Sequence, residues 1–143
     1  MRPFQLHTVL KYRQNLEDRA MQRLARVQQE AASLREERQE QQERLEQAQN
    51  DLEGFKREGA NISRIVLYRN HIHSIQARMD RLDSELHKAE QRVERKREEL
   101  LRASRSKRLL EKLKERQDHR YRRHLEDLEE SELDEIAVLY SKR

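Results

Sequence analysis

The chain contains no cysteine and no tryptophan, one proline at position 3, and two glycines in 143 residues. Without cysteine it has no disulfide, no thiolate metal ligand and no thiol nucleophile, and we expect a reducing compartment. No apolar run approaches the roughly 20 residues that a membrane-spanning helix needs. The first residues also lack the apolar stretch of a secretory signal. These absences predict a cytosolic protein with no direct membrane insertion.

Bulky apolar residues are scarce as well. Hydrophobic residues make up 34% of the chain and aromatic residues 4%, whereas 42% of the side chains are charged. This is too little apolar bulk for a thick globular core, yet both signs of charge are mixed along a regular pattern. The composition is typical of long helices and coiled coils rather than of disordered chains. We therefore expect an all-α protein that forms a single domain over residues 1–143.

Apolar residues recur at steps of three and four, which is the pattern of a narrow coiled-coil seam. In the first half the seam comprises Leu6, Val9, Leu16, Ala20, Leu24, Val27, Ala31, Leu34, Leu45, Ala48, Leu52 and Phe55. In the second half it comprises Ile65, Tyr68, Ile72, Ile75, Met79, Leu82, Leu86, Ala89, Val93, Leu100, Ala103 and Leu110. Two long helices that share one seam are the expected structure.

Both glycines fall between Gly54 and Asn61, where they predict a turn between the helices. Asn61 is a suitable N-cap for the second helix. The expected elements are a first helix at about 4–53, a turn at 54–61 and a second helix at about 62–140. A turn this short makes the helices antiparallel neighbours. The predicted fold is therefore an antiparallel coiled-coil hairpin whose second helix overhangs the first.

The predicted overhang, residues 112–140, combines apolar side chains with a reversal of charge. Residues 105–123 hold nine Lys or Arg and three acidic residues, so their net charge is 9 − 3 = +6, whereas residues 126–135 hold seven acidic residues and no basic one. An uncovered helix with this much apolar surface is expected to find a partner, although a solvated or folded-back helix is the simpler alternative. The aromatic residues lie near the overhang or near the turn, so both ends are candidate docking sites.

Most other functions are excluded by missing motifs. The sequence has no glycine-rich phosphate loop and no HExxH metal motif, and His71 and His73 face different sides of a helix. A two-helix rod has no enclosed cleft for catalysis, so we expect no catalytic residues, no metal and no cofactor. The basic stretch at 105–123 makes a nucleic-acid-binding coiled coil an alternative function. The acidic stretch beside it, however, would repel a duplex. Hence nucleic acid is not the expected partner.

Both ends of the chain carry short segments that are similar to those of a known family. They are FQLHTVLKYR at 4–13, LEDRA at 16–20, Leu24-Ala25, LEKLKER at 110–116, Tyr121 and LDEIA at 133–137. In this order and spacing they resemble the flagellar type III export protein FliJ family. Together with the glycine-marked turn, it covers essentially the whole chain. Stalk proteins of virulence-type injectisomes share this architecture and stay an alternative.

The resemblance implies a non-enzymatic stalk or adaptor at the inner membrane. Its expected partners are a hexameric export ATPase, a membrane protein of the export gate, and export chaperones. The pore of the ATPase would receive the end of the hairpin opposite the turn. The residues implied for ATPase binding are Phe4, Leu6, Val9, Arg13, Lys112, Leu113, Arg116, Arg120, Tyr121 and Leu125. Those implied for gate binding are Phe55, Tyr68, Ile72 and Ile75, although His71 stands where an aromatic is expected. We expect a monomer; a homo-oligomeric scaffold is the third alternative.

Overall fold

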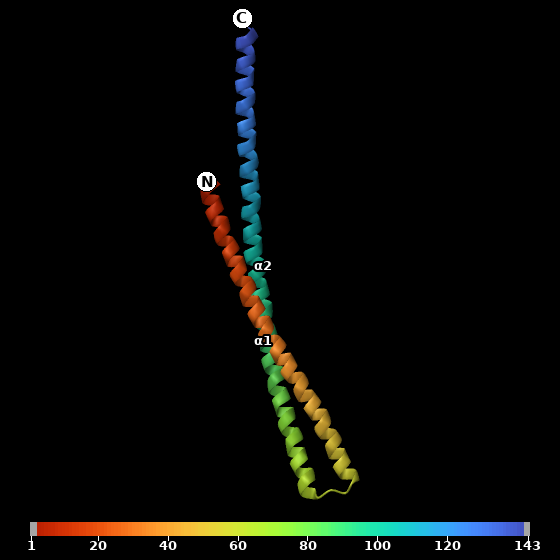
Figure 1. The fold of residues 1–143 in the computed structure, drawn as a ribbon. Helices are drawn as coiled ribbons and strands as arrows, with labels where there is room; N and C mark the ends of the chain where they lie inside the picture. Colours follow the sequence, from red (N-terminus) through yellow and green to blue (C-terminus); the bar gives the residue numbers. More distant parts are fainter. Residues whose placement is uncertain (1–2, 142–143) are drawn as a thin grey trace. The chain divides into compact units, whose positions relative to one another are not determined.

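Two long helices account for nearly all of the chain. The computed structural model describes residues 3–141, with side chains from residue 5, and contains α1 (Pro3–Arg57) and α2 (Ile62–Ser141) (Figure 1). No strand occurs within these residues. The predicted all-α, two-helix hairpin is confirmed.

The helices contribute to two compact units. The turn unit comprises Met21–Glu99 and therefore contains the turn with the helix on each side of it. The terminal unit combines the start of α1, up to Ala20, with the part of α2 from Leu100 onward. The single domain stays a prediction.

The turn is closed by a Schellman motif around Gly59. The N–H of Gly59 donates to the carbonyl of Lys56 at 3.4 Å, and the N–H of Ala60 donates to the carbonyl of Phe55 at 2.9 Å. Gly59 has φ 71°, in the left-handed region that closes this motif. The carbonyl of Asn61 accepts from the N–H groups of Arg64 and Ile65, so Asn61 occupies the predicted N-cap position.

The turn is shorter than the predicted 54–61. Gly54 lies inside α1, and its carbonyl accepts the helical hydrogen bond of the Glu58 N–H at 3.1 Å. In sequence the two glycines are equivalent breakers, but one left-handed residue suffices to end a helix. The cost of a glycine inside a helix, about 1 kcal/mol, is small for a helix stabilised by packing.

The two glycines are expected to respond oppositely to alanine. A Cβ built on either residue meets no atom within 4 Å, so only the backbone distinguishes them. Gly54→Ala should raise the free energy of unfolding by about 0.5–1 kcal/mol. Gly59→Ala should lower it by about 1 kcal/mol, because alanine resists a positive φ. Urea unfolding followed by circular dichroism measures both, and equal effects of the two variants would contradict this account.

The core of the turn unit lies next to the turn and consists of one layer. Its buried cluster consists of Ala48, Leu52, Ile72, Ile75 and Met79. Leu45, Ile65 and Tyr68 pack against this cluster from its edges. Further along the same helices Leu82 and Ala89 are almost completely buried. All of these residues belong to the predicted seam, which therefore positions the two helices.

Ion pairs between the helices fix their register away from the cluster. Arg38 is paired with Asp83 and Arg78 with Glu37, and these hydrogen bonds, followed by the attraction of the carboxylates, raise the pKa of both arginines above the usual value. A third, exposed pair joins Arg35 to Glu90 at 3.6 Å. Each exposed ion pair contributes little to stability, so we infer that these pairs mainly set the register of the two helices.

The terminal unit is packed more sparsely. Leu6 and Ala20 are its buried apolar side chains among those described, and the facing residues of α2 are at most half-buried. Half-buried residues of α2 continue as far as Gln117, whereas the predicted overhang began at Lys112. The turn between Arg57 and Ile62 is centred later in the chain than the predicted turn at 54–61. Each residue of such a shift moves the end of the helix pairing on α2 by two residues.

Candidate functional site

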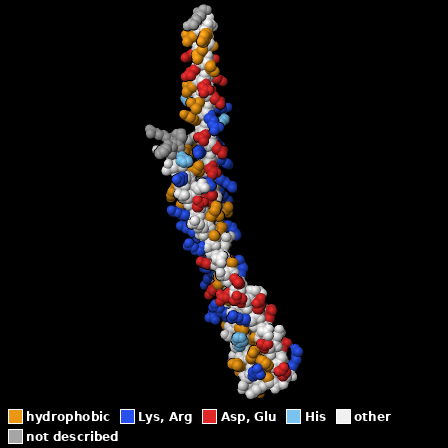
Figure 2. All heavy atoms as spheres, viewed as in Figure 1, with side chains coloured by type: hydrophobic (Ala, Val, Ile, Leu, Met, Phe, Trp, Pro, Cys, Tyr) orange, Lys and Arg blue, Asp and Glu red, His pale blue; other side chains and the backbone are white. Residues whose placement is uncertain are grey.

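Within residues 3–141, no other element covers the last part of α2. Every residue from Asp118 to Ser141 is exposed. The segment nevertheless carries large apolar side chains, which Figure 2 shows as hydrophobic patches among acidic ones. They are Tyr121, Leu125, Leu128, Leu133, Ile136, Val138, Leu139 and Tyr140. This exposed segment, residues 118–141, is the first candidate docking surface.

The exposed apolar side chains continue the seam that α1 covers. Within the terminal unit, Leu110, Lys114 and Gln117 follow each other at steps of four and three and are half-buried. The next steps along α2 reach Tyr121, Leu125 and Leu128 and then, after the charged Glu132, Ile136 and Leu139, which fall on the same helical face. The side-chain oxygen of Gln117 is buried without a hydrogen-bond partner at the point where coverage stops. The exposed segment therefore continues the face of α2 that packs on α1 before Gln117, which makes it a candidate interface.

The predicted ATPase-binding residues differ in their accessibility. Lys112, Leu113, Arg116, Arg120, Tyr121 and Leu125 are exposed on α2. On α1, Val9 and Arg13 are half-buried, and the side chain of Phe4 lies outside the described residues. Leu6 is 0% exposed, so its side chain supports the helix pairing and cannot itself touch a partner in this conformation. The binding roles of these residues stay predictions.

A partly buried ion pair links the two helices of the terminal unit. Lys107 Nζ lies 3.2 Å from a carboxylate oxygen of Glu17 and 3.7 Å from one of Glu111. A hydrogen bond from Ser104 and the attraction of Lys107 lower the pKa of Glu17, although burial works in the opposite direction. The charged form of Glu17 is thus favoured by folding.

This lowered pKa predicts an acid-sensitive contribution to stability. The contribution should be present above the usual glutamate value of 4.5 and be lost as the pH falls through the lower folded value. Glu17→Gln should therefore reduce the thermal midpoint at pH 7 more than at pH 3. The matched control is Glu98→Gln, since Glu98 is exposed and has no ion pair among the described residues. A loss that is equal at both pH values would exclude this role for Glu17.

The second candidate surface surrounds the turn. The rings of Phe55 and Tyr68 meet edge to face at 4.7 Å between centroids, and the guanidinium of Arg64 lies 4.3 Å from the centre of the Phe55 ring. The rings of His71 and Tyr68 are also arranged edge to face, with 6.3 Å between their centroids. The two aromatic side chains are half-buried, so they stabilise the turn and remain partly accessible.

The other two residues predicted for gate binding lie in the core. Ile72 and Ile75 are 9% and 5% exposed and belong to the buried cluster. Their influence on a partner would be indirect, through the position of α2. Three exposed apolar residues near the turn, Ile62, Val66 and Leu67, were not among the predicted site residues. Their signal was present in the sequence, because Val66 and Leu67 lie between the seam positions Ile65 and Tyr68, and Ile62 precedes the first of these positions.

The described residues contain no group of three or more side chains that could hold a metal ion. Neither described helix has a stretch apolar enough to cross a bilayer.

Comparison with known proteins identifies one family. The family model described as flagellar FliJ protein matches residues 1–143. Curated proteins and solved structures yield no match. The chain therefore belongs to the FliJ family, a family of non-enzymatic components of flagellar protein export.

Proposed function

We propose that the chain is a stalk that docks by its exposed segment, residues 118–141, in the pore of the hexameric export ATPase. The observation that supports this proposal is the uncovered continuation of the α2 seam. An apolar stripe of this length is unfavourable in water and gains free energy when a partner buries it. Docking would promote assembly of the ATPase ring and raise its activity.

The turn end would contact the export gate in the same assembly. Its accessible groups are the Phe55–Tyr68 pair and the exposed side chains of Ile62, Val66 and Leu67. Aromatic and apolar side chains of this kind are typical interface anchors. The stalk would thus link the ATPase to the gate, handle export chaperones, and act as a cytoplasmic monomer held peripherally at the inner membrane.

The proposal is tested with the purified chain and the export ATPase of the same system. Increasing amounts of the chain should raise the rate of phosphate release and the fraction of hexamer, measured by light scattering. Because basic and acidic stretches both take part, the effect should weaken at high salt without vanishing. The absence of any change in rate or assembly, at low and at high salt, would refute the proposed function.

A further inference from the structure

In the turn unit, α2 carries opposite charges on its two sides. The residues that directly precede the seam positions are His71, Ser74, Arg78, Arg81, Glu85, Lys88, Arg92 and Arg95. The residues that directly follow them are His73, Gln76, Asp80, Asp83, His87, Glu90, Glu94 and Arg97. Neighbours on either side of a seam residue are rotated in opposite directions around the helix. We call these two sets the basic flank and the acidic flank.

The charges of the acidic flank are largely neutralised, and those of the basic flank are not. Asp83 and Glu90 are paired with arginines of α1, and Glu94 is paired with Arg97 at 3.3 Å. On the basic flank Arg78 is paired with Glu37. No ion pair within the described residues involves the four other cations of this flank, which are Arg81, Lys88, Arg92 and Arg95. All four are exposed, so they are available to an external anion.

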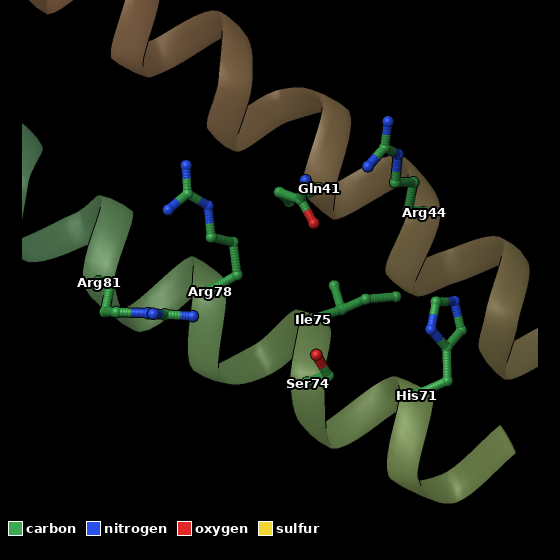
Figure 3. Close-up of a pocket in the computed structure, with 7 residues that line it drawn as sticks. All are labelled: Gln41, Arg44, His71, Ser74, Ile75, Arg78 and Arg81. Carbon is green, nitrogen blue, oxygen red and sulfur yellow. The ribbon is translucent and has the colours of Figure 1, made fainter. Parts of the chain in front are cut away.

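Helix α1 contributes one cation, Arg44, and one carboxylate, Glu30, to the same side. A hollow between the helices is lined by Arg44 of α1 together with Arg78 and Arg81 of α2, and no carboxylate lines it (Figure 3). In Figure 3 the side chains of Arg78 and His71 extend from α2 toward α1. A second hollow farther along the pair brings Arg92 near Glu30 and Ser33 of α1. The basic flank therefore borders two separate shallow hollows between the helices.

Three of the unpaired cations recur at a fixed interval. Arg81, Lys88 and Arg95 are seven residues apart, which corresponds to about 10.5 Å along the helix. A second helix lying along the basic flank would place carboxylates opposite these cations if it carried Asp or Glu at every seventh position. Repeated charge pairs of this type set the partner and the register of paired helices.

We propose that the basic flank docks an acidic helix of a partner protein, with carboxylates repeated every seven residues. A membrane surface fits less well, because no large apolar side chain of residues 22–61 or 68–100 is exposed and could enter the lipid. A nucleic-acid duplex carries one negative charge about every 1.7 Å, a far higher density than the cations here.

The test uses the full chain and two synthetic alanine-rich helical peptides of identical composition. One peptide carries Glu at every seventh position, and the other carries the same residues in scrambled order. Fluorescence anisotropy at low salt should show tighter binding of the seven-residue repeat. The triple variant Arg81→Glu, Lys88→Glu and Arg95→Glu should bind the seven-residue-repeat peptide more weakly, with a dissociation constant on the order of tenfold higher or more.

Single variants of the same helix provide the matched comparison. Lys88→Glu should weaken binding of the repeat peptide several-fold. Arg97→Glu also reverses a positive charge, but on the acidic flank, and should leave this binding nearly unchanged. Circular dichroism verifies that both variants keep their helices. Equal binding of both peptides, equal effects of the two single variants, or tighter binding of anionic vesicles or duplex DNA at the same salt would each overturn the proposal. No ATPase takes part, so this result is independent of the proposed stalk function.

Discussion

A chain that ends at Gln117 should no longer stimulate the export ATPase, while its helical hairpin remains folded. The removed residues 118–141 are all exposed, so their loss takes away no packing from the described structure. They nevertheless include Tyr121, Leu125 and Leu128, the first uncovered residues of the seam. Buried anchors of this kind are each worth about 1–2 kcal/mol or more in an interface, so the affinity should fall by roughly 100-fold or more.

Two point variants distinguish a docking stripe from a merely helical tail. Leu125→Ala combined with Leu128→Ala removes apolar groups from the stripe and should lose most of the stimulation. Asp127→Ala combined with Glu130→Ala alters the opposite side of the same helix and should lose much less. Phosphate release measures the activity and circular dichroism the helix content. If the shortened chain stimulates the ATPase as well as the full chain, the segment 118–141 is not the docking end.

The seam and the turn show how far the sequence determined the fold. The regular steps of three and four identified the residues that are buried in the turn unit, including Leu82 and Met79. The turn was less certain, because the behaviour of Gly54 depends on whether packing keeps α1 helical beyond it. Glycine is compatible with a helix and with a turn, so composition alone favoured a turn that began four residues too early.

The candidate sites were predicted less completely for two physical reasons. The resemblance marked Ile72 and Ile75 as contacts, but their spacing also placed them in the seam, and they are buried there. The two flanks can be read from the sequence once the seam is known, but the seam pattern does not reveal which of their charges are neutralised across the helices. That depends on the pairing of Arg38 with Asp83 and of Arg78 with Glu37, which only the three-dimensional register determines.

The same single-layer packing predicts that Leu82→Ala is strongly destabilising. Leu82 is 0% exposed, and within the turn unit it is the one large side chain described with less than 2% exposure. A two-helix pair has no second layer that could fill the space left by the missing side chain. Large-to-small changes at such sites cost about 2–5 kcal/mol, and we expect about 3 kcal/mol here.

The matched control is Leu67→Ala, which removes the same atoms from a side chain that is 65% exposed. Its effect on the free energy of unfolding should stay within about 0.5 kcal/mol. Urea unfolding followed by circular dichroism measures both variants, and the slope of the transition shows whether they still unfold in the same way. Equal losses in the two variants would mean that the seam at Leu82 does not hold the hairpin together. A large loss at Leu82 alone would place the stability of the turn unit in its seam, leaving the exposed residues of the turn end free for binding.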